Sequence, residues 1–169
     1  HAAVQVVDIG GLVEGASKGE GLGNKFLANI REVDAIVLVL RAFVDDDVMG
    51  PSDPLEHLRV VELELALADL ETVERRLAQA TKQAKSDRSV GDELAALQVA
   101  HDALAAGRPL YRAGLTTEQR ELLAPHFLLT NRRVLVVVNV GEEDLERIPE
   151  FEARLAAELN EAGDNVEVI

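Results

Sequence analysis

Residues 6–25 read VVDIGGLVEGASKGEGLGNK, and they predict a phosphate-sensing loop at the edge of a sheet. The run from Val4 to Ile9 is apolar enough for a buried strand, and Asp8 stands near its end. Six glycines follow between Gly10 and Gly23, and glycines let backbone N–H groups approach an anion closely. We therefore expect the rest of the fold to be arranged around this loop.

Strand and helix signals alternate on both sides of the chain's middle. The sequence predicts a helix from about residue 24 to 33, strands at 35–43 and 133–140, a helix at 150–162 and the start of a strand at 166–169. A strand, a helix and a second strand in so short a span imply a parallel βαβ unit. We therefore expect an α/β fold with a parallel sheet.

A long helical insertion separates the two α/β parts. Asp53 as the cap and Pro54 at the first helical position mark its start. An apolar heptad pattern follows, formed by Leu63, Leu70, Leu77 and Ala84, with Ala66 or Leu67, Val73 and Ala80 between them. A polar turn and a second helix, with Leu94, Leu97, His101 and Leu104, complete an antiparallel coiled-coil arm. The predicted boundaries are 1–52, 53–127 and 128–169.

Composition excludes several classes of protein and site. With 17 Lys and Arg against 31 Asp and Glu, the net charge of −14 opposes direct DNA binding, and contact with RNA would need a local basic patch. The absence of cysteine excludes disulfides and thiolate metal sites and fits a cytoplasmic setting. The longest apolar runs, 35–40 and 134–138, are far shorter than the roughly 20 residues of a membrane helix.

Two short motifs carry candidate chemistry. Asp8 and Gly11 fit Asp-x-x-Gly, which in nucleotide switches places a carboxylate near the water shell of Mg²⁺ and an N–H near the γ-phosphate. A chance match is the alternative, because only two positions of the motif are fixed. Asn139, Val140 and Glu142 follow a later strand, where such a fold holds its nucleotide base. The alternative there is an ordinary strand-to-helix turn capped by Asn139.

Other polar groups give weaker signals. Leu12 stands where Ras-like switches carry a glutamine that orients water, and leucine cannot form a hydrogen bond. Of the histidines, His57, His101 and His126 show no spacing that suits a metal site, and we expect His101 to lie on the helical seam. The catalytic residue is therefore unknown from the sequence.

These residues closely resemble the YchF / Obg-like ATPase family of P-loop NTPases. Residues 6–36 are similar to its switch region, Asp-Ile-Ala-Gly-Leu-Val-x-Gly-Ala-Ser-Lys-Gly-Glu-Gly-Leu-Gly-Asn, with Gly10 in place of the family's alanine. The likeness continues through residues 62–77, where the family has its helical arm, and through 128–130 into Asn-x-x-Glu at 139–142. It covers essentially the whole chain.

The resemblance implies a partial Ras-like domain interrupted by a coiled-coil arm, which binds ATP, or alternatively GTP, together with Mg²⁺. In this family Asn-x-x-Glu replaces the guanine-reading Asn-Lys-x-Asp, so Glu142 is expected to accept a hydrogen bond from the adenine amino group. The resemblance also implies slow hydrolysis of the nucleotide and a link to the ribosome and to translation or stress regulation. The alternative is a non-catalytic binding module whose arm docks on a partner.

The chain also departs from the family pattern. The family's proposed catalytic histidine lies in a loop after the strand predicted at 35–43, and residues 44–52 contain no histidine. The phosphate-gripping Gly-x-x-x-x-Gly-Lys-Ser/Thr loop and the TGS domain of the family are also absent from the sequence. We therefore expect an interior piece of a longer protein, inactive as an NTPase on its own.

Overall fold

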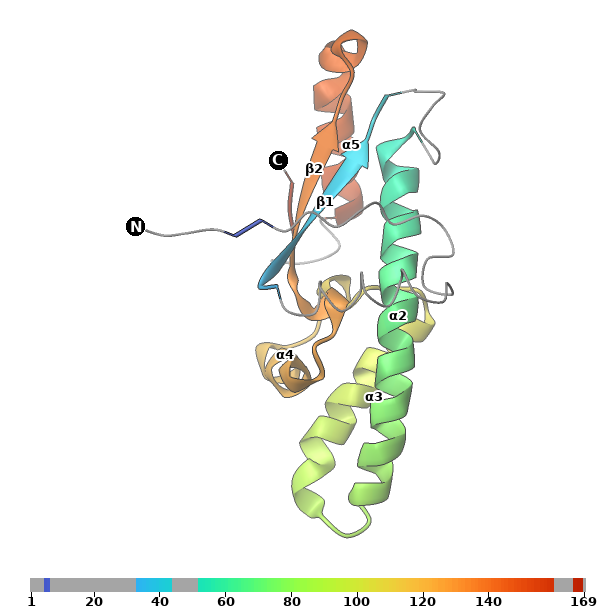
Figure 1. Ribbon diagram of the computed structural model, residues 1–169, viewed down its shortest axis with the longest axis vertical. Helices are drawn as coiled ribbons and strands as arrows, with labels where there is room; N and C mark the ends of the chain where they lie inside the picture. Colours follow the sequence, from blue (N-terminus) through green and yellow to red (C-terminus); the bar gives the residue numbers. More distant parts are fainter. Residues whose placement is uncertain (1–4, 7–32, 44–51, 160–165, 169) are drawn as a thin grey trace, which may run out of the picture.

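A parallel three-stranded sheet forms one half of the molecule. The computed structural model describes residues 5–6, 33–43, 52–159 and 166–168, with the strands β1 (Ala35–Arg41), β2 (Arg133–Asn139) and β3 (Val166–Val168). They lie in the order β1-β2-β3, and both pairings are parallel (Figure 1). The predicted parallel sheet is confirmed for these strands. Of the strand predicted at 4–9, only residues 5 and 6 are described; they do not form a strand, and Val6 is 86% exposed. The glycine loop lies outside the described residues, as does the helix predicted after it except for Val33, which is not helical.

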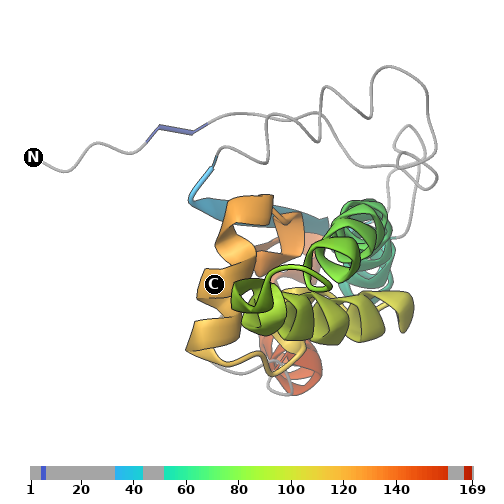
Figure 2. The same ribbon diagram turned by 90° about the horizontal axis from the view of Figure 1, so that it is seen from below.

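The sheet buries one of its faces. Along β1, Ile36, Leu38 and Leu40 are buried, whereas Val37 and Val39 are 54% and 59% exposed. This alternation follows from the strand's two-residue period, which sends successive side chains to opposite faces. The described helices lie on the buried side, as the view along the hairpin shows (Figure 2).

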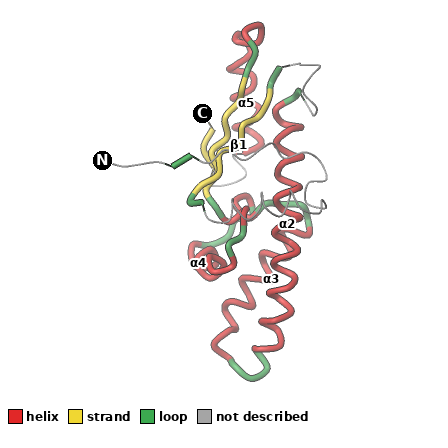
Figure 3. The backbone as a smooth tube through the Cα atoms, in the orientation of Figure 1, coloured by secondary structure: helices red, strands yellow, loops and turns green. Residues whose placement is uncertain are grey.

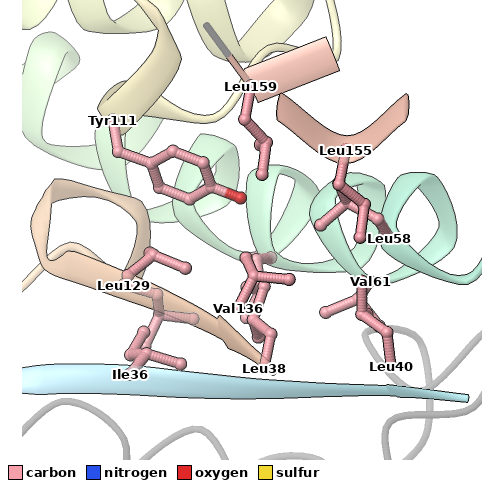
Figure 4. Packing of buried hydrophobic residues seen from close by; sticks show 13 residues of the cluster. Ile36, Leu38, Leu40, Leu58, Val61, Tyr111, Leu129, Val136, Leu155 and Leu159 are labelled. Carbon is pink, nitrogen blue, oxygen red and sulfur yellow. The ribbon is translucent and has the colours of Figure 1, made fainter. Parts of the chain in front are cut away.

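Two helices supply most of the cover for that face. They are α2 (Pro54–Gln83) and α5 (Ile148–Leu159). Their apolar side chains and the ring of Tyr111 meet the strand side chains in a single core (Figure 4). Its buried members include Ile36, Leu38, Leu40, Leu58, Val61, Tyr111, Leu129, Val136, Leu155 and Leu159. The predicted amphipathic helix near the end of the chain is thereby confirmed, and it begins two residues earlier than expected.

Helix α2 begins at the predicted cap. The Asp53 side chain accepts hydrogen bonds from the N–H groups of Leu55 and Glu56 at 2.9 and 3.2 Å, and Pro54 occupies the first turn. With 30 residues, α2 is about 45 Å long. Its first half covers the sheet, and its second half extends beyond the amino ends of the strands (Figure 1).

The second half of α2 pairs with α3 (Gly91–Ala105) in an antiparallel hairpin (Figure 3). A short 3₁₀ turn, η2 (Arg88–Val90), joins the two helices. The side chains between them come mostly from the predicted seam, namely Ala66, Val73 and Ala80 with Leu70 and Leu77 on α2, and Leu97 and Leu104 with Leu94 on α3. His101 lies at the rim of this contact, half-buried.

The prediction is wrong for the amino-terminal end of the seam on α2. Leu63 is 47% exposed. Of the two residues predicted as alternatives for the next position of the seam, Ala66 is buried and Leu67 is exposed. The reason is the length of α3, which ends at Ala105, so the hairpin contact does not extend along the first half of α2. There the burial of α2 is set by the sheet instead.

A compact connection leads from α3 back to the sheet. It contains η3 (Leu110–Arg112), α4 (Thr117–Leu123), η4 (Ala124–His126) and η5 (Leu129–Asn131). The predicted capping box of α4 is confirmed, because Thr116 N–H donates to Gln119 Oε1 at 2.9 Å and Gln119 N–H donates to Thr116 Oγ1 at 3.2 Å. Of the helices in the described ranges, none has the length and apolar character needed to cross a membrane.

Candidate functional site at the carboxyl edge of the sheet

The carboxyl ends of β1 and β2 meet at one edge of the sheet. Arg41 stands opposite Asn139 in the register, and the N–H of Ala42 donates to the Asn139 carbonyl at 2.9 Å. In open α/β sheets, ligands bind outside the carboxyl ends of the strands, because the loops that follow the strands form a crevice there. This edge is therefore the candidate site.

The loop after β2 presents two polar side chains at this edge. Asn139 is exposed at the end of the strand, and Glu142 is exposed at the start of η6 (Glu142–Arg147). Among the described residues, neither side chain has a hydrogen-bonding or ion-pairing partner. Val140 between them is half-buried. Within the described residues, an exposed amide and an exposed carboxylate thus lie on the loop after β2 at this edge.

Gly141 lies against the side chain of Glu143. A Cβ atom at this position would lie 3.0 Å from both Cδ and Oε1 of Glu143, which is closer than such atoms normally approach. The Gly141 carbonyl accepts a hydrogen bond from the N–H of Asp144 at 3.0 Å, which closes the first turn of η6. A side chain at residue 141 would therefore displace Glu143 from its position beside the loop.

Arg147 ties η6 to α5. Its guanidinium contacts Asp144 at 2.9 Å and Glu150 at 3.3 Å, and it lies over the Phe151 ring at 4.7 Å from the centroid. Hydrogen bonds to Glu150 and then Asp144 raise the pKa of Arg147 above its usual value. The loop that carries Asn139 is therefore continuous with an element fixed on the core through Phe151.

The start of α2 is anchored at the same edge. Arg154 on α5 donates to Asp53 Oδ2 at 2.7 Å, while Asp53 Oδ1 caps α2. Partial burial raises the pKa of Asp53. This effect is outweighed by the hydrogen bond and charge of Arg154 and by the N–H groups of Glu56 and Leu55, so the net pKa lies below its usual value. Both oxygens of this carboxylate are thus engaged in holding the fold.

His57 also lies beside this edge. Its Nδ1 accepts a hydrogen bond from the N–H of Arg41 at 3.2 Å. Burial, and then the charge of Arg41, lowers the pKa of His57 below 6.5, so the ring is neutral at pH 7. With Nδ1 accepting, the proton belongs on Nε2, which makes His57 a hydrogen-bond donor through that atom.

The predicted site residues fall into two groups. Asn139, Val140 and Glu142 lie together on the loop after β2, whereas Asp8 and Gly11 lie outside the described residues. In the part of the chain that the structure describes, no three His, Cys, Asp or Glu side chains form a group able to hold a metal ion. Away from the site, His126 Nε2 contacts Glu93 Oε1 at 3.0 Å.

Known proteins with similar sequences are ribosome-binding ATPases by name. No protein-family model matches the chain. The ribosome-binding ATPase YchF of Bacillus subtilis is 42% identical over 171 residues, covering 99% of this chain and 47% of that protein. The ribosome-binding ATPase YchF of Haemophilus influenzae is 41% identical over 150 residues, covering 86% of this chain and 41% of that protein. The chain is a homologue of the YchF proteins.

A solved YchF structure agrees with this relationship. The YchF GTPase of Schizosaccharomyces pombe superposes with a TM-score of 0.70 at 30% identity, and the match covers 95% of this chain and 46% of that one. The resemblance to YchF seen in the sequence is therefore confirmed both by identity and by fold. The chain spans less than half the length of the YchF proteins that it matches.

The sequence did not place three residues at this edge of the sheet. Asp53 was predicted only as a cap, His57 was considered only as a metal ligand, and neither Arg41 nor Arg154 was singled out. Arg41 ends a parallel strand and His57 lies in the first turn of the next helix, so the rule that strand ends converge would have found both. For Arg154 the sequence holds no such signal, because its contact with Asp53 spans 101 residues.

Proposed function

We propose that this chain is part of a nucleotide-binding switch protein that acts with the ribosome in the cytoplasm. The observation that carries the proposal is its identity of about 40% to proteins named ribosome-binding ATPase YchF, over 86–99% of its length. The fungal relative is named a GTPase, so the bound nucleotide is ATP or GTP. Slow hydrolysis belongs to the whole protein.

The proposed nucleotide contacts come from two places in the chain. Asn139, Val140 and Glu142 contact the base, with the Glu142 carboxylate accepting from the adenine amino group. Asp8 would bind Mg²⁺ through water, and the N–H of Gly11 would approach the γ-phosphate. The side chains of Asn139 and Glu142 are exposed at the carboxyl edge of a parallel sheet and have no partner among the described residues, which supports the first group.

The proposed domain division follows the helical insertion. Residues 1–52 and 128–169 would form two parts of a Ras-like domain, and residues 53–127 would form an inserted coiled-coil arm. The antiparallel contact of α2 with α3 through Val73, Ala80 and Leu97 supports the arm. The alternative of a binding module without nucleotide is not favoured, because the relatives are named as ATPases or a GTPase.

The base-reading role of Glu142 can be tested in a full-length protein that contains this chain. We expect Glu142→Ala to lower the ratio of ATP to GTP affinity about tenfold, because one hydrogen bond to a charged group contributes roughly 1.5–3 kcal/mol. Isothermal titration calorimetry with both nucleotides gives the ratio.

The matched control is Glu146→Ala, which removes another exposed carboxylate of η6. It should leave both affinities unchanged. If Glu142→Ala also leaves the ratio unchanged while the wild type binds nucleotide, Glu142 does not read the base. Absence of nucleotide binding by the wild-type protein would instead overturn the proposed function itself.

A further inference from the structure

A surface hollow beside α4 combines cationic side chains with an aromatic ring. Its volume is about 220 Å³, and its wall includes Arg120, Glu121, Phe127, Asn131 and Arg132. These residues belong to α4 and to the segment that leads into the amino end of β2. The hollow therefore lies at the other end of the strands from the candidate nucleotide site (Figure 1).

Arg120 carries a half-buried charge that has no acidic partner in the described part of the chain. Its guanidinium donates to Asn131 Oδ1 at 3.3 Å and to the Leu110 carbonyl at 3.2 Å, and both acceptors are neutral. Burial lowers the pKa of Arg120, whereas at Arg112 the effect of burial is outweighed by carboxylates, which raise the pKa. A partly buried cation without a counter-ion is costly, so an anion in the hollow would be stabilised there.

The guanidinium of Arg120 is also held in a fixed orientation. While it donates to the Asn131 side chain, Asn131 Nδ2 donates to the Arg120 carbonyl at 3.1 Å, which makes the contact between the two residues reciprocal. A guanidinium has five N–H donors in a planar fork that matches a carboxylate, and the described contacts use only some of them. Because Arg120 lines the hollow, the remaining donors are available to a ligand there.

The charges around the hollow match a single negative charge. Arg120 and Arg132 are positive and Glu121 is negative, so two positive charges and one negative charge leave the lining with a formal charge of +1. A carboxylate balances this charge. A phosphate group carries about −1.5 to −2 charges at pH 7 and would be repelled by Glu121, so it is the poorer fit.

Phe127 supplies an apolar contact beside these charges. Its ring is 55% exposed, and it is the one aromatic side chain among the exposed large apolar residues of the described ranges. The next residue, Leu128, is buried, so the chain turns into the core directly after the ring. Aromatic and arginine side chains are the residue types most enriched where protein interfaces bind most strongly.

The backbone of Phe127 is strained. Its φ of 52° and ψ of 43° lie in the left-handed region, and no other non-glycine residue in the described part of the chain has a positive φ. This conformation ends η4, where the Phe127 N–H donates to the Ala124 carbonyl at 3.2 Å. Glycine or asparagine would adopt it at lower cost, so the turn alone does not account for a phenylalanine. The strain therefore indicates a role for the ring itself.

We propose that the hollow docks an acidic peptide segment of a protein partner. A Glu or Asp carboxylate of that segment binds the Arg120 guanidinium, and a neighbouring apolar side chain packs on the Phe127 ring. A volume of about 220 Å³ is below the roughly 300–1,000 Å³ of sites that enclose cofactors and other small molecules, and it suits a single side chain. The proposal goes beyond nucleotide binding and does not depend on it, because the nucleotide site lies at the opposite edge of the sheet.

The test compares three short peptides as ligands of a full-length protein that contains this chain. The probes are acetyl-Leu-Glu-Leu-amide, its glutamine analogue and its phosphoserine analogue. We expect NMR shifts at the Phe127 amide and the Arg120 Nε–H, with a Kd on the order of 1 mM for the Glu peptide and about tenfold weaker binding of the Gln peptide. Equal affinity for these two peptides, tighter binding of the phosphoserine peptide, or no shifts at about 10 mM peptide would overturn the proposal.

The variant Arg120→Gln tests the carboxylate contact. It should bind the Glu peptide about tenfold more weakly and the Gln peptide as the wild type does, so the preference for the carboxylate disappears. A merely structural effect would weaken both peptides alike and keep the preference. The matched control Arg108→Gln removes an exposed cation of the same connection and should also keep it. A retained preference in Arg120→Gln, or its loss in both variants, would overturn the proposal.

The variant Phe127→Asn tests the ring. Because asparagine adopts the left-handed region more readily, the melting temperature should rise by about 2 °C or more, while affinity for the Glu peptide falls about fivefold with the lost apolar contact. The control Val99→Asn removes another exposed apolar side chain, on α3, and should leave affinity within about twofold of the wild type. Unchanged affinity in Phe127→Asn, or equal losses in both variants, would overturn the proposal. So would a lower melting temperature, because the ring would then serve the fold.

Discussion

At the scale of single residues, Asp69 shows how a buried carboxylate can organise a fold. It is fully buried in the middle of α2. Its oxygens accept hydrogen bonds from the N–H groups of Leu129 and Thr130 at 2.8 and 2.7 Å, and from Thr130 Oγ1 at 2.7 Å. Because these donors immediately precede β2, the carboxylate fixes where the chain re-enters the sheet.

We expect Asp69→Ala to lower the free energy of unfolding by about 3 kcal/mol or more. The substitution leaves two buried N–H groups and one hydroxyl without their acceptor, and each such loss costs roughly 1–3 kcal/mol. Urea unfolding followed by circular dichroism measures the change. The control Asp92→Ala removes an exposed carboxylate in the same hairpin and should change stability by less than about 0.5 kcal/mol. Similar effects for both variants would contradict this account of Asp69.

The role of Asp69 could not be predicted from the sequence. Residues 62–77 carry several acidic side chains that alternate with leucines, and such charges on a long helix ordinarily face water. What buries Glu62 and Asp69 is contact with groups 49 and 60 residues further along the chain. No periodicity within α2 contains that information, whereas the buried apolar positions follow directly from local spacing.

At the scale of an element, the start of α2 was predictable because its determinants are local. Asp53 and Pro54 lie next to each other, and the cap geometry follows from those two residue types. The ion pair from Asp53 to Arg154 adds a link that only the fold provides. Through it, the helix that leads to the hairpin is fastened to the helix that follows the candidate base-binding loop.

We expect Asp53→Ala to destabilise the protein by about 1 kcal/mol and Asp53→Asn by less, since asparagine also caps helices. The pKa of Asp53 is lowered in the fold from its usual 3.8, so its charge stabilises the fold above that value. That contribution is lost as pH falls through the depressed pKa. The wild type should therefore have a higher free energy of unfolding than Asp53→Asn at neutral pH, and this difference should disappear below the depressed pKa. Urea unfolding at a series of pH values measures it. A difference in the free energy of unfolding that grew as the pH fell would contradict a stabilising role for the ionised Asp53.

The candidate site was also predictable only in part. Asn139 and Glu142 were proposed from the sequence because a parallel strand that ends on polar residues marks the ligand edge of an α/β sheet. The link from Asp53 to Arg154 at the same edge could not be predicted in this way, because the two residues lie 101 positions apart in the sequence.

At the scale of the whole molecule, one polar cluster joins the base of the hairpin to α5. Glu62 on α2 accepts from Tyr111 Oη and from Arg112, each at 2.8 Å. Arg112 also donates to the carbonyl of Glu158 at 2.8 Å and contacts its carboxylate at 3.3 Å. Three elements distant in sequence, namely α2, η3 and α5, thus share one set of charges. This cluster sets how the hairpin is held relative to the sheet.

The two sides of this cluster respond differently to burial. At Glu62, which is 4% exposed, burial raises the pKa above 4.5, and the Tyr111 hydrogen bond and Arg112 charge offset it only in part. At Arg112, burial lowers the pKa, but the carboxylates of Glu62 and Glu158 outweigh it and the net pKa is raised. The carboxylate of Glu62 is therefore tolerated in the core because the Tyr111 hydroxyl and the Arg112 cation accompany it.

We expect Arg112→Met to lower the free energy of unfolding by about 3–5 kcal/mol at neutral pH. Methionine keeps much of the hydrocarbon volume, but the buried charge of Glu62 loses its cation. A carboxyl group whose folded pKa lies above its unfolded pKa is destabilising when ionised and neutral in effect when protonated. Without Arg112 the pKa of Glu62 rises further. The deficit of the variant should therefore shrink as pH falls below that raised pKa, which urea unfolding at a series of pH values can follow.

A matched arginine separates this effect from a general loss of positive charge. Arg59 also contacts Glu158, at 3.0 Å, but its side chain is 60% exposed, so Arg59→Met should cost less than about 1 kcal/mol at any pH. Adding Glu62→Gln to Arg112→Met should recover part of the lost stability and abolish the pH dependence, because the buried charge is then gone. A loss that is independent of pH, or that Glu62→Gln does not relieve, would show that Arg112 acts through packing and its contact with Glu158 instead.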